Sequence, residues 1–123
     1  MTLLDTNILI EILKGNQNTV KTVESMSERA AISAITVMEL YYGALNKAEL
    51  REIERFVALF HILHLNETIS QTSVKLVHKY AKSHSLDIPD SIIAATAITC
   101  KCPLFTYKKK DFNYIEGLTL LKI

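Results

Sequence analysis

Residues 2–10 read Thr2-Leu3-Leu4-Asp5-Thr6-Asn7-Ile8-Leu9-Ile10, a short apolar run that is followed at once by an acid and then by a second apolar stretch. This pattern predicts a strand over Thr2–Leu4 and a helix over Asn7–Lys14 that ends at Gly15. Asp5 therefore follows the carboxyl end of a strand. Open parallel sheets bind their ligands beyond this edge, so the acid lies where a functional site is expected.

Short apolar stretches and amphipathic stretches alternate along the rest of the chain. Further strands are predicted over Ala30–Ala34, His61–Leu65, Pro103–Tyr107 and Thr119–Lys122. Further helices are predicted over Asn16–Arg29, Thr36–Asn46, Ala48–Phe60, Asn66–His84 and Asp87–Lys101. Strands that alternate with helices imply a mainly parallel sheet with helices on both faces. We therefore expect an α/β fold with three layers.

The composition limits the classes of protein to which the chain can belong. Its 123 residues fit one domain, and the 49% of hydrophobic residues suffice for a buried core. A formal net charge of +1 excludes a broad basic surface but not a local patch. We expect no membrane span and no signal peptide, because no apolar run is long enough and Asp5 interrupts the first one. The two cysteines, Cys100 and Cys102, are too few for a disulfide scaffold or a zinc site, which favours the cytoplasm.

Four carboxylates fall where the predicted strands end or the next helices begin: Asp5, Glu39, Asp90 and Asp111. At least three of them are expected at the carboxyl edge of the sheet, and Asp90 joins them if its helix starts on that side. Carboxylates that are brought together repel one another, and a hard divalent cation removes this cost. Mg²⁺ prefers such oxygen ligands and can activate water for the cleavage of a phosphodiester.

Each of these acids also has a purely structural interpretation. Thr36 and Glu39 fit a capping box, in which Thr36 begins a helix and Glu39 lies in its first turn. Asp87 and Asp90 fit the start of a helix at Pro89, and Asp5 fits the cap of the first helix. For Asp87 we favour the cap. For the other acids, their expected shared location favours a functional role.

Four segments, in order along nearly the whole chain, resemble the motifs of PIN-domain ribonucleases, especially the VapC toxins of toxin–antitoxin pairs. They are Leu4-Asp5-Thr6-Asn7-Ile8-Leu9-Ile10, Thr36-Val37-Met38-Glu39-Leu40-Tyr41-Tyr42-Gly43, Asp87-Ile88-Pro89-Asp90-Ser91-Ile92-Ile93-Ala94-Ala95-Thr96-Ala97, and Pro103-Leu104-Phe105-Thr106 with Asp111-Phe112. The resemblance implies a single PIN domain over residues 1–123, with the PIN-like α/β/α sandwich. It also implies a metal-dependent endoribonuclease that forms a homodimer and is inhibited by a cognate antitoxin, with tRNA among the candidate substrates.

Carried over by position, the resemblance makes Asp5, Glu39 and Asp90 the acids that hold Mg²⁺ or Mn²⁺. Asn7 and Thr106 match positions that support these acids by hydrogen bonds. Relatives usually carry Asn or Asp two residues after this threonine, but Lys108 stands there. Asp111 could replace the missing ligand, or the site could rely on three acids.

Lys108 leads a run with Lys109 and Lys110 that either meets RNA phosphates or forms a solvated loop. It also motivates an alternative function, a non-catalytic PIN-like module that binds RNA or protein, because a lysine could take the place of the metal. A phosphoacceptor receiver domain has a similar size. The sequence disfavours it, since His64-Leu65-Asn66 stands where an acid should follow the middle strand.

Overall fold

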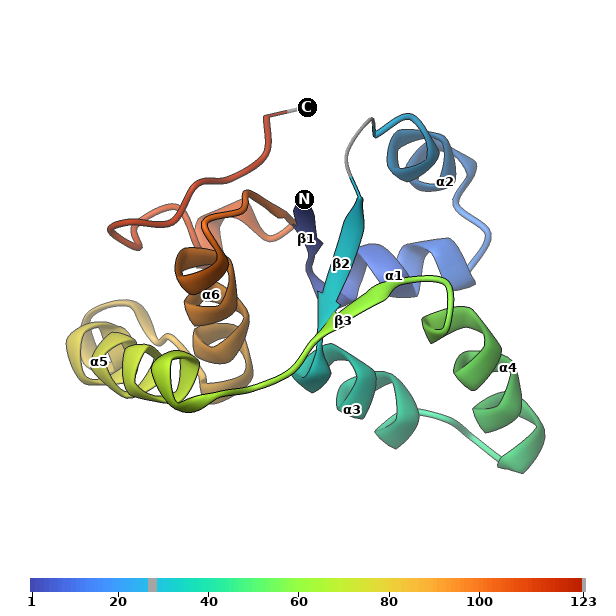
Figure 1. Cartoon of the computed structure of the whole chain (residues 1–123), viewed down its shortest axis with the longest axis horizontal. Coiled ribbons are helices and arrows are strands. Elements are labelled where there is room, and N and C mark those ends of the chain that lie inside the picture. Colours follow the sequence, from blue (N-terminus) through green and yellow to red (C-terminus); the bar gives the residue numbers. More distant parts are fainter. Residues whose placement is uncertain (27–28, 123) are drawn as a thin grey trace.

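The computed structural model of the chain describes residues 1–26 and 29–122, and its elements alternate much as the sequence predicts (Figure 1). The strands are β1 (Thr2–Leu4), β2 (Ala30–Ser33), β3 (His61–Leu63) and β4 (Leu104–Phe105). The helices are α1 (Thr6–Leu13), α2 (Gln17–Glu24), α3 (Ala34–Tyr42), α4 (Lys47–Val57), α5 (Glu67–His84), α6 (Ile88–Cys100) and the short 3₁₀ helix η1 (Lys109–Asp111). No helix within the described part of the chain is long and apolar enough to cross a membrane.

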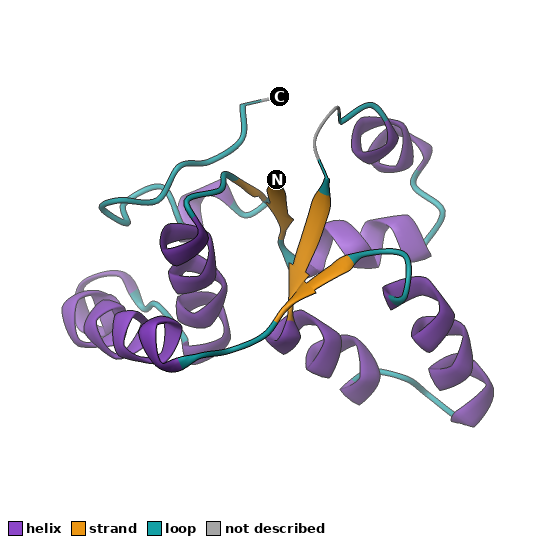
Figure 2. Ribbon diagram, viewed as in Figure 1, coloured by secondary structure: helices purple, strands orange, loops and turns teal. Residues whose placement is uncertain are grey.

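The four strands form one parallel sheet in the order β3-β2-β1-β4. Leu3 of β1 pairs with Ala31 on one side and with Leu104 on the other. Helices α5 and α6 lie on one side of this sheet and α1 to α4 on the other, which gives three layers (Figure 2). The predicted three-layer α/β/α sandwich is therefore confirmed. Because all strands run in the same direction, their carboxyl ends meet at one edge.

The alternation of side chains along each strand divides the core into two clusters. The cluster against α5 and α6 contains Leu3, Ala31 and Leu104 from the sheet. The cluster against α1, α3 and α4 contains the next residue of each strand, Leu4, Ile32 and Phe105. Both faces of the strands are thus buried, as is usual for a parallel sheet, and this fixes the register of the residues that follow the strands.

Helix α3 begins earlier than the sequence pattern predicts. It starts at Ala34, immediately after β2, with Ser33 as its N-cap. The Ser33 hydroxyl accepts a hydrogen bond from the backbone N–H of Ile35 at 3.2 Å. The predicted capping box of Thr36 and Glu39 is therefore wrong, and Glu39 lies in the second turn of α3 rather than the first. A capping serine three residues before an equally suitable threonine makes the sequence ambiguous here.

Two other expectations differ from the structure. The predicted strand over Thr119–Lys122 is reduced to an isolated parallel bridge between Leu104 and Leu120. The predicted helix over Asn16–Arg29 ends at Glu24, and its residues 27–28 lie outside the described residues. Neither difference moves a residue of the predicted site.

Candidate functional site

Asp5 is held between the carboxyl ends of two neighbouring strands. Its Oδ1 accepts a hydrogen bond from the backbone N–H of Thr6 at 2.8 Å, which caps α1. Its Oδ2 accepts from the hydroxyl of Thr106 at 2.7 Å, and Thr106 directly follows β4. Asp5 is only 1% exposed. The carboxylate is therefore fixed by two neutral donors, the first backbone N–H of α1 and the hydroxyl of the residue that follows β4.

Glu39 is connected to Asp5 through Thr6. The hydroxyl of Thr6 donates to Glu39 Oε1 at 2.8 Å, while the backbone N–H of the same residue donates to Asp5. The Thr36 hydroxyl lies 2.9 Å from that of Thr6. Since Thr6 gives its single hydroxyl proton to Glu39, Thr36 must be the donor of this contact. Thr36, proposed from the sequence as a cap, instead helps to orient the threonine between two acids.

Asp90 lies at the third position of α6, and Asp87 is the cap of that helix. Asp87 Oδ1 accepts from the backbone N–H of Asp90 at 2.9 Å, so the cap favoured for Asp87 is what the structure shows. Asp90 is 9% exposed. Both of its carboxylate oxygens lie 3.3 Å from the Nζ of Lys108. The partner of this acid is thus a charged amine on a long side chain.

The other residues predicted for the site make indirect or longer-range interactions with these acids, or are exposed nearby in sequence. Asn7 donates to the Thr106 hydroxyl and accepts from the backbone N–H of Tyr107, each at 3.4 Å. It therefore acts on Asp5 only through Thr106. Asp111 is exposed and lies in η1, where it interacts electrostatically with Asp5 and Lys108. Lys109 and Lys110 are exposed on the same short helix.

Burial dominates the electrostatics of the two central acids. It raises the pKa of Asp5, against the opposing effects of the Thr106 hydrogen bond and the Lys108 charge. It also raises the pKa of Asp90 to about 6, where Lys108 opposes the shift and the charges of Asp87 and Asp5 add to it. Burial alone would lower the pKa of Lys108, but the charges of Asp90 and Asp5 outweigh it and raise that pKa. Both acids are thus harder to ionise than in water, chiefly because they are buried.

The donor chemistry of the site fits a hard divalent cation. Asp5, Glu39 and Asp90 offer only carboxylate oxygens, the ligands that Mg²⁺ prefers. Their arrangement fits less completely. Among residues 1–26 and 29–122, no three His, Cys, Asp or Glu side chains lie close enough together to hold a metal ion as they stand. Glu39 is turned toward Thr6, and Lys108 lies against Asp90. Both side chains would have to move to complete the site.

Comparison with known proteins decides the family. The family model described as PIN domain matches residues 2–118. The chain belongs to the PIN domain family. Ribonuclease VapC10 of Mycobacterium tuberculosis is 31% identical to this PIN domain over 121 residues, which cover 96% of this chain and 90% of the relative. Ribonuclease VapC1 of Rickettsia felis is 32% identical over 129 residues and covers 98% and 95% of the two chains.

Solved structures agree with this assignment of the PIN domain. A toxin-antitoxin complex from Klebsiella pneumoniae contains a chain that is 32% identical, with a TM-score of 0.82 over 100% of both chains. VapBC-1 from nontypeable Haemophilus influenzae contains one that is 27% identical, with a TM-score of 0.84 over 98% of this chain and 96% of that one. Sequence and fold together make this PIN domain a member of the VapC group.

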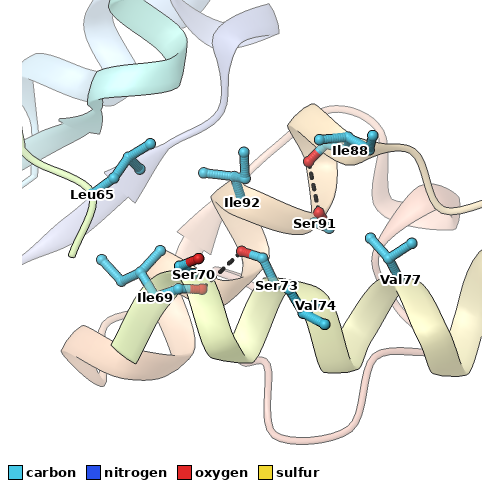
Figure 3. A pocket seen from close by; sticks show the side chains of 9 residues that line it. All are labelled: Leu65, Ile69, Ser70, Ser73, Val74, Val77, Ile88, Ser91 and Ile92. Carbon is cyan, nitrogen blue, oxygen red and sulfur yellow. Dashed lines mark hydrogen bonds between the residues drawn. The ribbon is translucent and has the colours of Figure 1, made fainter. Parts of the chain in front are cut away.

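Two pockets are formed between helices of the PIN domain, and one of them includes the site acid Glu39. One of about 430 Å³ lies between α1, α3 and α4 and includes the residues that directly follow α1 and α3. It is lined by Ile10, Leu13, Lys14, Glu39, Leu40, Gly43, Glu49, Glu52 and Ile53. The other, of about 340 Å³, lies between α5 and α6 and is almost wholly apolar (Figure 3). Its wall is formed by Leu65, Ile69, Ser70, Ser73, Val74, Val77, Ile88, Ser91 and Ile92. Three of its apolar side chains are well exposed, namely Leu65, Val74 and Ile88.

Sequence reasoning missed the role of Thr6. Its place directly after Asp5 shows that it lies near the site, but not that its hydroxyl faces Glu39. That contact joins residues 33 positions apart and depends on the packing of α1 against α3. The sequence pattern contains no signal for it.

Proposed function

We propose that this PIN domain is a metal-dependent endoribonuclease that hydrolyses RNA phosphodiester bonds and is inhibited by a cognate antitoxin. The observation that carries the proposal is the pair of buried carboxylates, Asp5 and Asp90, at one edge of the sheet, where burial raises the pKa of both acids and the charge of Asp5 further raises that of Asp90. Such a pair is costly to keep charged and fits a divalent cation. The names of the relatives, ribonuclease VapC, support the choice of RNA as the substrate.

The side chains divide the work in the following way. Asp5, Glu39 and Asp90 would hold Mg²⁺ or Mn²⁺, and Asp111 would complete the set directly or through water. When bound, the cation would supply positive charge at the phosphate and would lower the pKa of a bound water for attack on phosphorus. Thr6 and Thr106 keep Asp5 in place, and each Asp5 oxygen still has a lone pair free. Lys109 and Lys110, exposed beside Asp111, would contact the phosphates of RNA.

An antitoxin segment would bind in the pocket between α1, α3 and α4. Glu39 lines this pocket together with Glu49 and Glu52, and its floor includes the apolar side chains of Leu40 and Ile53. A segment with apolar and basic side chains complements both properties. Because Glu39 belongs to the pocket and to the proposed metal site, such a segment would block catalysis by occupying one ligand. The chains matched in the solved toxin–antitoxin complexes support this partner.

The apolar pocket between α5 and α6 supports a homodimer. Val74 and Ile88 are each 66% exposed at its rim, and Leu65 is 42% exposed. Apolar side chains gathered in this way are usually covered by a partner. Light scattering should give twice the mass of the chain, and Val74→Glu should return it to a monomer. A wild-type protein that remains monomeric at micromolar concentration would contradict this part of the proposal.

The experiment that tests the proposed function is RNA cleavage by the purified chain in the absence of antitoxin. We expect tRNA and structured RNA to be cut with Mg²⁺ or Mn²⁺ and to stay intact with EDTA, while DNA of the same sequence serves as the control. Two results together would refute the proposed ribonuclease activity. One is the absence of cation-dependent cleavage across these RNAs, and the other is that the Asp5→Asn variant affects cell growth as the wild type does.

The contact between Lys108 and Asp90 favours one alternative function. An ammonium 3.3 Å from both oxygens of an acid can replace a metal ion permanently, as in a non-catalytic module that binds RNA or protein. Titration with Mn²⁺ separates the two functions. Binding heat that disappears in Asp90→Asn supports the enzyme, and its absence in the wild type supports the binding module.

A further inference from the structure

Lys108 lies in an unusual place for a lysine. It stands at the position where the family resemblance leads us to expect Asn or Asp, and its Nζ lies 3.3 Å from each oxygen of Asp90. The equal distances mean that the ammonium faces the open end of the carboxylate. A cation that is shared by both oxygens would approach Asp90 from this same direction.

Three contacts from other parts of the loop hold the lysine in this position. Its backbone N–H donates to the Thr106 hydroxyl at 2.9 Å, and this hydroxyl in turn donates to Asp5. Its Nζ lies 5.9 Å from the centre of the Phe112 ring, which is completely buried. Its carbonyl accepts from the backbone N–H of Asp111 at 2.9 Å. The backbone of Lys108 is therefore fixed to the same network that orients the first acid.

The charges around the ammonium explain why it stays there. Asp90 and Asp5 attract it most strongly, and Asp111 adds to the attraction. Its side chain is nevertheless 43% exposed, whereas that of Asp90 is 12% exposed. The ammonium can therefore turn out to solvent while the backbone keeps its place, but the carboxylate cannot.

We propose that Lys108 is a built-in competitor of the divalent cation: its ammonium occupies the open end of Asp90 and must leave before a cation binds there. This inference rests on the proposed function, because it concerns the cation that the acids would hold. Two positive groups cannot share one end of a carboxylate without strong repulsion. The affinity for the cation is thus reduced by the ion pair that has to be broken, and binding displaces the lysine toward solvent.

Isothermal titration of the full-length purified chain with Mn²⁺ tests this proposal. Lys108→Met removes the ammonium and adds no ligand, Lys108→Asn adds an oxygen, and Lys109→Met makes the same charge change on the exposed neighbour. Since breaking a partly exposed ion pair has a modest but measurable effect, we expect Lys108→Met to bind Mn²⁺ about tenfold more tightly than the wild type. Lys108→Asn should bind at least as tightly as Lys108→Met, and Lys109→Met should behave like the wild type. The rise in melting temperature on adding Mn²⁺ should follow the same order.

Two outcomes at Lys108 itself would overturn the proposed competition while leaving the proposed function intact. One is equal Mn²⁺ affinity in the wild type and Lys108→Met. The other is tighter binding in Lys108→Asn alone, because the gain would then come from the added oxygen. Absence of Mn²⁺ binding in the wild type and in all three variants would overturn the competitor and the metal dependence together. Tighter binding in Lys109→Met as well would show a general charge effect and would also refute competition at Asp90.

Discussion

The two central acids of the site are held by opposite means. Asp5 receives hydrogen bonds from the first backbone N–H of α1 and from the hydroxyl of Thr106, which directly follows β4. Asp90 stands in the first turn of a helix, and its partner is the amine of a half-exposed lysine. A backbone N–H and a short buried side chain cannot withdraw from Asp5, whereas an ammonium on a long flexible side chain can withdraw from Asp90. The difference indicates that Asp5 is a permanent anchor of the site and that Asp90 is the acid whose partner can be exchanged.

The largest effect is expected from removing either acid. Asp5→Asn and Asp90→Asn keep the shape of the side chain and can still accept hydrogen bonds, but they remove the charge that would hold the cation. A supporting residue of a metal site typically contributes 10- to 100-fold, so we expect cleavage of RNA to fall by more than about 100-fold in each variant and in Glu39→Gln. Initial rates with Mn²⁺ measure this. Glu54→Gln, an exposed change on α4, should leave the rate unaltered, and an Asp5→Asn enzyme of normal rate would exclude Asp5 as a ligand.

A smaller effect is expected in the pH dependence of the unfolding free energy, to which Asp90 contributes. The pKa of Asp90 is raised to about 6 from 3.8, so the folded state binds this proton more tightly than the unfolded state does. The resulting stability is fully present below pH 3.8 and is lost as the pH rises through 6. Relative to Asp90→Asn, the metal-free wild type should lose about 2 to 3 kcal/mol of unfolding free energy over this range. Urea unfolding with EDTA at pH 4, 5, 6 and 7 measures the difference, and a constant difference would contradict the raised pKa.

The anchor of Asp5 can be loosened without touching the acid itself. Thr106→Val removes the hydroxyl that donates to Asp5 at 2.7 Å and keeps the size of the side chain. Because this donor serves a buried charge, we expect a loss of about 2 kcal/mol in unfolding free energy. Thr99→Val is the matched control. Within residues 1–26 and 29–122 the buried Thr99 hydroxyl has no hydrogen-bond partner, so its removal should be neutral or stabilising. Equal effects of the two changes would mean that Thr106 does not anchor Asp5.

The smallest effect is expected from Lys109 and Lys110, the two exposed lysines that follow Lys108. Lys109 and Lys110 are exposed, so each would contribute only a screened contact with a phosphate. The double variant Lys109→Ala with Lys110→Ala should weaken RNA binding by roughly three- to tenfold and reduce its dependence on salt. Fluorescence anisotropy at several salt concentrations measures both quantities. An unchanged salt dependence would assign the two lysines to a solvated loop.

Much of the fold could be predicted from the sequence because its signals are local. The alternation of short apolar runs with amphipathic stretches predicts the three layers. The positions of the acids after the strands predict that these acids share the carboxyl edge of the sheet. The sequence alone does not decide where α3 starts, because Ser33 and Thr36 are both good N-caps. The choice depends on where β2 ends, and it ends at Ser33. The predicted last strand is absent for another reason, since its residues up to Lys122 form a single isolated bridge with β4.

The details of the site depend on contacts between distant parts of the chain. The residue types and positions of Asp5, Asp90 and Lys108 can be read from the sequence, but the 3.3 Å contact between Lys108 and Asp90 cannot. It requires the loop after β4 to fold back over the start of α6, 18 residues earlier. The hydroxyl of Thr6 likewise joins Asp5 to Glu39 only after α1 has packed against α3. Sequence patterns indicate which side chains reach the edge of the sheet, and tertiary packing decides which of them touch.

The most direct test of the central claim, that Asp5 and Asp90 together hold a divalent cation, is the position of Mn²⁺ in crystals grown with the ion. The anomalous scattering of manganese identifies it without regard to function. We expect a peak at bonding distance from carboxylate oxygens of both Asp5 and Asp90, with the Lys108 ammonium withdrawn from Asp90. A manganese peak elsewhere in the molecule would contradict the account. So would a crystal grown with saturating Mn²⁺ in which Lys108 still occupies Asp90 and no manganese lies between the two acids.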